Sequence, residues 1–128
     1  MYTIDDLVEE YKGLTKNCYQ VDYSNKKALK KNNDSVKRMY EIIETVKNEF
    51  AADGILELAS LLDDENYRTN LWIATQLLEN VTLDKQTEEK AFRIVEKVAK
   101  GDDILALGYR YWICTTTNIR HCSFVVNF

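Results

Sequence analysis

Apolar side chains recur along most of this chain at spacings of three and four residues, the period of an amphipathic α-helix. The clearest stretch is residues 58–78, LASLLDDENYRTNLWIATQLL. One apolar stripe ends at Leu62, a polar turn follows at 63–66, and a second stripe continues to Leu78. Small Ala74 lies within the second stripe, where it lets a neighbouring helix approach closely. The pattern predicts two helices joined by a tight turn.

Capping residues divide the rest of the chain into further helices, giving about six in all. Thr3 and Asp6 approximate a capping box at the start of the first helix. Ser24, Asp53 and Asp84 are the expected N-caps of the second, third and fifth. The predicted helices cover about 4–18, 25–50, 55–62, 66–79, 85–100 and 102–113.

The last predicted helix and the residues after it differ from the rest. Residues 104–113, ILALGYRYWI, are apolar nearly all round, which predicts that this helix is central or covered. After Ile113 the composition becomes β-prone. We expect residues 114–128 to form an extended tail docked on the helices, because Phe124 and Phe128 would otherwise be exposed.

Composition indicates one soluble domain over residues 1–128. Proline is absent and there are only 4 glycines, so few residues interrupt helices. No apolar run is long enough to span a membrane, and the N-terminus lacks the basic and apolar regions of a signal peptide. The 3 cysteines lack the spacing of a disulfide framework. Together these features predict a cytoplasmic protein with free thiols.

Four segments carry a resemblance to a known class of helical domain. They are Ser24-Asn25-Lys26, Leu58-x-x-Leu61-Leu62-Asp63, Leu71-Trp72-Ile73-Ala74-Thr75-x-Leu77-Leu78 and Ala91-x-x-Ile94-Val95-Glu96. Over about residues 20–112 the chain resembles HEAT-like helical domains that occur as short bacterial proteins of unknown function. The resemblance implies an all-α, HEAT-like α-solenoid with binding surfaces rather than catalysis. It does not extend to Thr69-Asn70, where HEAT-type units usually carry a Val-Arg pair.

Charge is distributed unevenly along the chain. Residues 25–40 carry six basic side chains against Asp34 alone, whereas residues 41–65 hold eight carboxylates against Lys47. With a net charge of −4, the chain outside residues 25–40 therefore carries −9. An acidic surface favours basic partners, and it acts mainly on encounter rate and specificity.

The sequence contains no pattern that indicates catalysis, a metal or a cofactor. Cys114, His121 and Cys122 are three widely spaced residues, whereas a structural zinc site needs four ligands, usually in close pairs. The carboxylate pairs Asp63-Asp64 and Glu88-Glu89 fall at predicted turns or first helical turns, where capping and the helix dipole explain them. We therefore predict a protein that is not an enzyme and has no cofactor.

Trp72 is the strongest candidate for a partner contact. If Ala74 packs inward, Trp72, Gln76 and Glu79 fall on another face of the same helix. An exposed tryptophan among polar groups is typical of a binding anchor, and the alternative is that another helix covers it. The predicted partner-binding residues are Asp63, Asp64, Glu65, Trp72, Gln76 and Glu79.

These features favour a non-catalytic protein-binding module. The function that we predict is that of an immunity protein, which binds and neutralises a bacterial toxin with a basic domain, for example a nuclease. The first alternative is a scaffold or adaptor protein built of helical repeats. The second is a nucleic-acid binder that uses the lysines of the second helix, Lys26, Lys27, Lys30 and Lys31.

Overall fold

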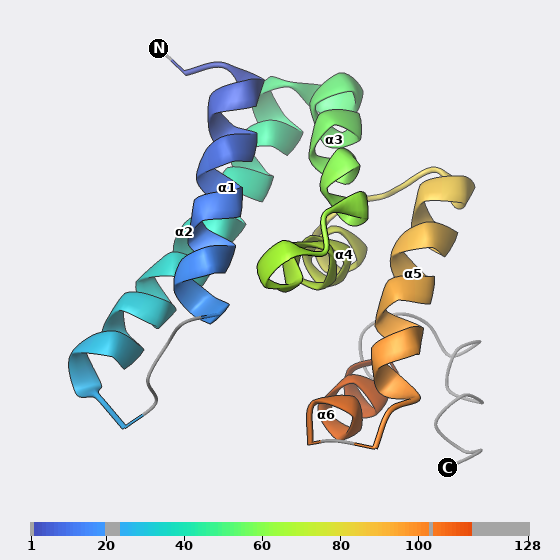
Figure 1. Ribbon diagram of the computed structural model, residues 1–128. Helices are drawn as coiled ribbons and strands as arrows, with labels where there is room; N and C mark the ends of the chain where they lie inside the picture. Colours follow the sequence, from blue (N-terminus) through green and yellow to red (C-terminus); the bar gives the residue numbers. More distant parts are fainter. Residues whose placement is uncertain (1, 20–23, 103, 114–128) are drawn as a thin grey trace.

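The computed structural model describes residues 2–19, 24–102 and 104–113. These residues form helices and contain no strand, which confirms the all-α prediction (Figure 1). The elements are α1 (Ile4–Tyr19), α2 (Lys26–Glu49), α3 (Ala51–Ala59), the 3₁₀-helices η1 (Ser60–Asp63) and η2 (Asn66–Arg68), α4 (Thr69–Asn80), α5 (Lys85–Ala99) and α6 (Ile104–Trp112).

Helix α4 occupies the centre of the arrangement. Helices α1 and α2 form an antiparallel pair, and α4 is seen nearly end-on between this pair and α5 (Figure 1). It contacts α1, α2, α3, α5 and both 3₁₀-helices, whereas α6 packs on α5. The predicted solenoid arrangement of HEAT-like pairs is not confirmed.

The helix starts follow local sequence signals closely. At α1 the Thr3 backbone N–H donates to Asp6 Oδ2 over 2.8 Å, and the Asp6 N–H donates back to Thr3 Oγ1, as the capping box predicts. Asp84 caps α5 as predicted, through a bond from the Thr87 N–H. At α2 the cap is Asn25 rather than Ser24, because the Asn25 side chain accepts the N–H groups of residues 27 and 28.

The corner between α2 and α3 is tighter than the sequence predicts. The chain turns at Ala51, which has a positive φ of 51°, and α3 begins there instead of at Ile55. Asp53 therefore lies in the first turn of α3 and is not its N-cap. Gly54 makes this corner possible, because a Cβ atom there would lie 2.3 Å from Phe50 Cβ and 2.9 Å from Val46 Cγ1.

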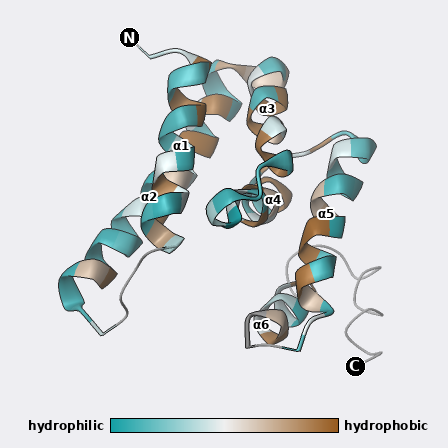
Figure 2. Cartoon of the chain, viewed as in Figure 1, coloured by the Kyte–Doolittle hydropathy of each residue, from teal (hydrophilic) through white to brown (hydrophobic). Residues whose placement is uncertain are grey.

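Helix α2 continues without a break through Asn32 and Asn33. Its buried residues begin only at Ser35, so residues 26–34 have no buried side chain. In Figures 1 and 2 this hydrophilic first part of α2 extends past the end of α1. The long helix thus has a solvated first part, residues 26–34, and a packed remainder.

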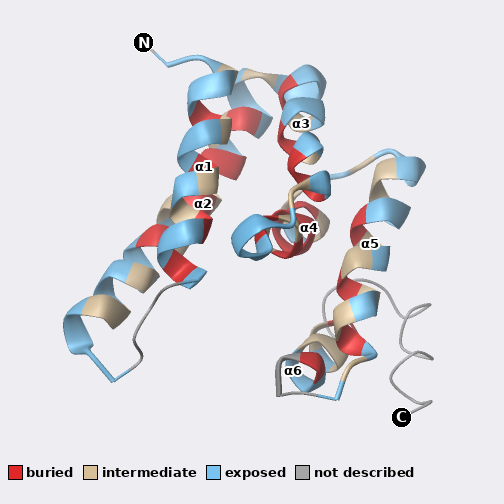
Figure 3. Cartoon of the chain, in the orientation of Figure 1, coloured by how far each residue is buried: buried red, intermediate tan, exposed pale blue. Residues whose placement is uncertain are grey.

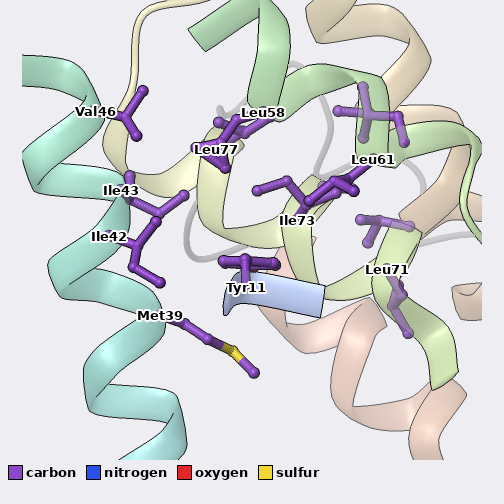
Figure 4. Packing of buried hydrophobic residues seen from close by; sticks show 14 of the residues in the cluster. Tyr11, Met39, Ile42, Ile43, Val46, Leu58, Leu61, Leu71, Ile73 and Leu77 are labelled. Atoms are coloured by element: carbon purple, nitrogen blue, oxygen red, sulfur yellow. The ribbon is translucent and has the colours of Figure 1, made fainter. Parts of the chain in front are cut away.

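The hydrophobic core surrounds α4 (Figure 3). Seven of its residues are buried: Thr69, Leu71, Ile73, Ala74, Thr75, Gln76 and Leu77. Figure 4 shows Ile73 and Leu77 among side chains from the neighbouring helices, including Tyr11, Ile43 and Leu58. The central helix is therefore α4, whereas the sequence pattern predicted that the last helix is central or covered.

The apolar side chains of α6 and of Ile113, which follows it, are not all covered by described residues. Ala106 and Ile113 are buried, but Leu107 is 64% exposed and Tyr111 is 73% exposed. The prediction of a helix covered all round is therefore wrong for these two side chains. The predicted docked tail, residues 114–128, lies outside the described residues, as do Cys114, His121 and Cys122. Within the part of the chain that the structure describes, no helix has the length and apolar character needed to cross a membrane.

Substitution of Ala74 by leucine is expected to destabilise the protein. The Ala74 side chain is fully buried in the core cluster, so a larger side chain must displace its neighbours. Overpacking of this kind costs about 1–3 kcal/mol in the free energy of unfolding. Urea denaturation followed by circular dichroism measures the change, and an unchanged midpoint would contradict the close packing around α4.

Candidate functional site

The acidic turn between η1 and η2 is held by hydrogen bonds that its middle residue accepts. Asp64 Oδ1 accepts the Asn66 N–H over 3.0 Å, and the Asp64 carbonyl accepts the Asn70 N–H over 2.8 Å. Asp64 is accordingly only partly exposed, whereas Asp63 and Glu65 on either side are exposed. Asp63 forms an ion pair with Lys90 of α5 over 2.7 Å. The turn thus presents two of its three carboxylates to solvent.

The next two residues have an unusual backbone. Tyr67 and Arg68 both adopt left-handed conformations, with φ of 54° and 58°. This conformation costs roughly 1–2 kcal/mol for each residue that is not glycine. Contacts with the end of α1 accompany it: the rings of Tyr67 and Tyr19 meet edge to face at 5.7 Å, and the Arg68 guanidinium lies 5.9 Å from the Tyr19 ring. The strained pair places Arg68 beside the acidic turn.

A groove of about 760 Å³ separates this segment from α5. Leu62 and Leu71 line one bank but are only 3% and 5% exposed, so the accessible apolar side chains of the lining are the partly buried Ile94 and Val98. Helix α5 forms the other bank, and its lining residues follow the spacing of one helical face. The charged lining residues are Asp63, Glu65, Arg68, Lys90, Arg93 and Lys97.

Gln76 is not on the exposed face that the sequence suggested. It is 1% exposed; its Oε1 accepts the Tyr11 hydroxyl over 2.7 Å, and its Nε2 lies 3.6 Å from Met39 Sδ. Thr75 is buried as well, and Trp72 is partly buried against the core. The reason is that α4 is enclosed from several sides, so its polar residues bond inside the protein. Gln76 therefore offers no side chain to a partner in this conformation.

Glu79 lies at the opposite end of α4 from the acidic turn. Helix α4 has 12 residues, which corresponds to a length of roughly 18 Å. The Glu79 carboxylate accepts hydrogen bonds from Trp112 Nε1 over 2.7 Å and from the Tyr40 hydroxyl over 3.1 Å. The structure therefore brings together Asp63, Asp64 and Glu65 but places Glu79 in a separate cluster that joins α2, α4 and α6.

The Tyr40 hydroxyl is expected to ionise at a higher pH than an ordinary tyrosine does. Its burial, followed by the charge and hydrogen bond of Glu79, raises the pKa of Tyr40 from 10.0 to about 12. Because the folded-state pKa is raised, the stabilisation from this group is complete below pH 10 and is lost as pH rises through about 12. Absorbance titration of the wild type and of Tyr40→Phe measures the pKa by difference. Glu79→Gln is expected to lower it, and an unchanged value would contradict the bond.

The basic residues of α2 differ in their surroundings. Lys26, Lys27, Lys30 and Lys31 are exposed on the solvated first part of the helix. Arg38, in contrast, forms two bonds to the Glu10 carboxylate of α1, at 2.6 and 3.0 Å. The exposed basic side chains of α2 therefore include four lysines near its start, together with Lys37 and Lys47 farther along.

No metal site appears among the described residues, in which no group of three or more His, Cys, Asp or Glu side chains lies close enough to hold an ion. Cys18 is a buried free thiol, and burial raises the pKa of that thiol. A raised pKa reduces the thiolate fraction, which is the reactive form. The Cys18 side chain thus has the properties of a core residue.

Comparison of the chain with known protein families, with curated proteins and with solved structures finds no match. The resemblance to HEAT-like domains is therefore unconfirmed. The α5 bank of the groove was not among the predicted site residues. Its signal was present in the sequence, because Lys90, Arg93 and Lys97 recur at spacings of three and four residues.

Proposed function

We propose that this chain is a non-catalytic protein-binding module that acts as an immunity protein and neutralises a bacterial toxin. The observation that carries the proposal is the groove beside the acidic turn, which combines apolar surface with a charged rim. Protein–protein interfaces commonly have this composition, an apolar centre within a polar border. Glu65, which is exposed on this rim, is the carboxylate best placed to meet a partner.

Charge supports a basic toxin as the partner. The chain carries −9 outside residues 25–40, and a field of this sign accelerates encounter with a basic protein. Toxins that cut nucleic acid need basic surfaces to bind phosphates. A protein that blocks such a toxin by occupying its surface needs no catalytic residues of its own.

Affinity capture from the source cell, followed by co-expression with the captured protein, tests this proposal. Wild-type chain should restore growth in the presence of a toxic partner. Glu65→Lys should weaken the complex roughly tenfold, because it places a positive charge against a basic partner. Glu44→Lys is the matched control, since Glu44 is also exposed but lies on α2, away from the groove.

Two results would count against the proposal. Capture of a stable structural assembly without any toxic protein would support the scaffold alternative instead. Equal weakening by Glu65→Lys and Glu44→Lys would show that net charge matters and that the groove is not the contact. Trp72→Ala is a poorer test, because Trp72 packs against the core and its loss affects folding as well as binding.

A second candidate function, nucleic-acid binding, is favoured by the exposed lysines of α2. If this surface binds a phosphate backbone, affinity should fall steeply with salt, with a logarithmic slope of about 0.9 for each phosphate contact on duplex DNA. Replacing Lys26, Lys27, Lys30 and Lys31 with glutamine should then flatten that slope. Fluorescence anisotropy with a labelled duplex measures both effects, and absence of binding at low salt excludes this function.

A further inference from the structure

The α5 bank of the groove is a regular stripe of cationic and apolar side chains. Lys90, Arg93 and Lys97 alternate along the helix with Ile94 and Val98, at the spacing that places all five on one face. The lysines and the arginine are exposed, whereas the two apolar residues are partly buried. This bank therefore offers positive charge along its edge and apolar surface beneath it.

The charges in the groove do not cancel. Lys90 is neutralised by Asp63 across the groove, at 2.7 Å. Within the described residues no carboxylate forms an ion pair with Arg68, Arg93 or Lys97, and Glu65 is the other acidic residue of the lining. The groove thus has an excess of positive charge on a chain whose net charge is −4.

Apolar surface beside unpaired cations selects a particular ligand chemistry. We infer that the groove binds an acidic segment of a partner protein, one that alternates carboxylates with apolar side chains. A nucleic-acid backbone fits less well, because it has no apolar groups for Ile94 and Val98 and its phosphates would meet Asp63 and Glu65. This inference rests on the proposed function in one respect, that both contacts belong to one partner: the basic surface of the partner meets Glu65 on the rim, and a separate acidic segment of the same protein enters the groove.

The dimensions of the α5 stripe match an extended segment. Arg93 and Lys97 are separated by one helical turn, a rise of roughly 6 Å. In an extended chain, side chains on the same face recur about every 7 Å. Carboxylates at alternate positions of the segment therefore meet successive cations along the edge of α5, while the intervening apolar side chains face Ile94 and Val98 beneath them.

Arg68 supports this reading from the other bank. It lines the groove although its left-handed backbone conformation would suit glycine better. Its side chain contributes a third cation without an ion-pair partner among the described residues, and its guanidinium lies 5.9 Å from the Tyr19 ring. Arg68→Gly therefore separates binding from folding: it removes the cation while relieving the backbone.

The test uses the full chain and two labelled peptides, one alternating Glu with Leu and one alternating Lys with Leu. The Glu peptide should bind at least roughly tenfold more tightly than the Lys peptide. The double variant Arg93→Glu/Lys97→Glu should lose roughly tenfold or more in affinity for the Glu peptide. Lys26→Glu/Lys30→Glu, which changes net charge equally on α2, should stay within about twofold of the wild type. Arg68→Gly should weaken binding without lowering the melting temperature.

Equal affinity for the two peptides, or equal losses in the two double variants, would overturn the inference. The inference would also be wrong if a single-stranded oligonucleotide bound more tightly than the Glu peptide and if Arg93→Glu/Lys97→Glu abolished that binding. The groove would then be a phosphate-binding site. Different results distinguish this inference from the proposed function. If the variant Arg93→Glu/Lys97→Glu neutralises a captured toxin as well as the wild type does, the immunity function stands and the inference about the groove is wrong. If the groove binds the Glu peptide but no toxic partner is captured, the inference about the groove stands and the immunity function is wrong.

Discussion

Replacement of Tyr11 by alanine is expected to lower the free energy of unfolding by about 3–5 kcal/mol, enough to unfold a marginally stable domain. The Tyr11 ring is fully buried where α1 meets α2 and α4, so its removal leaves a large cavity (Figure 4). The Gln76 amide oxygen also loses the hydroxyl that it accepts at 2.7 Å. Thermal and urea denaturation of the variant measure the loss.

Two conservative variants separate the cavity from the hydrogen bond. Tyr11→Phe keeps the ring and should cost about 1–3 kcal/mol, because a buried amide oxygen remains without its donor. Gln76→Leu should cost a similar amount by leaving the hydroxyl unpaired. The double variant should be less destabilised than the two single effects added together. Strict additivity would mean that the bond between the two side chains contributes nothing.

Tyr19→Phe provides the matched control on the same helix. Tyr19 is 58% exposed, so loss of its hydroxyl should change stability by no more than about 0.5 kcal/mol. A similar loss in Tyr11→Phe and Tyr19→Phe would contradict the assignment of the effect to the buried bond.

Alanine at Gly54 should also destabilise the protein strongly, although alanine is the better helix former. Its Cβ atom would lie 2.3 Å from Phe50 Cβ, so α3 must shift away from the end of α2. Overpacking costs about 1–3 kcal/mol, which exceeds the gain of about 0.5–1 kcal/mol from helix propensity. Denaturation midpoints at constant m-value measure the difference.

Gly13 is the internal reference for this prediction. It lies inside α1, and a Cβ atom there would meet nothing within 4 Å. Gly13→Ala should therefore stabilise the protein by about 0.5–1 kcal/mol. Opposite signs at the two glycines are the expected result. An increase in stability at both positions would show that the corner between α2 and α3 can accommodate a Cβ atom at residue 54.

The features that the sequence predicted correctly depend on neighbouring residues. The caps at Thr3 and Asp84 bond to groups three residues away, so short motifs describe them fully. The apolar period likewise predicts the helices, because each helix buries one face. The starts of α2 and α3 were missed by one and four residues, since Asn25 competes with Ser24 as cap and the Ala51 corner depends on tertiary packing.

The burial of Gln76 could not be predicted in the same way. Its partner Tyr11 lies 65 positions away in the chain, and a glutamine on a helix is ordinarily placed in solvent. The central place of α4 likewise depends on residues distant in the chain, because Thr69 and Gln76 bond to Thr15 and Tyr11 of α1. Helix α6 is richer in apolar residues yet packs beside the centre. Composition alone does not decide which helix is enclosed.

The candidate site was predicted in part. A tight turn keeps residues 63–65 together, and two of them, Asp63 and Glu65, line the groove. Trp72 and Glu79 were grouped with it on helical spacing, which gives the face of a residue but not its distance along the axis. The cations of α5 reach the groove only through tertiary packing of α4 on α5.

The solvated first part of α2 has a consequence for native-state amide exchange. Residues 26–34 have no buried side chain, so their helical hydrogen bonds open by fraying and without global unfolding. Their amides should exchange with deuterium far faster than those around Ile42 and Ile43, which exchange only when the core opens. A bound ligand slows exchange where it binds. Slowed exchange at 26–34 would locate a nucleic acid on the lysines, and slowed exchange at 62–71 and 90–98 would locate a protein segment in the groove.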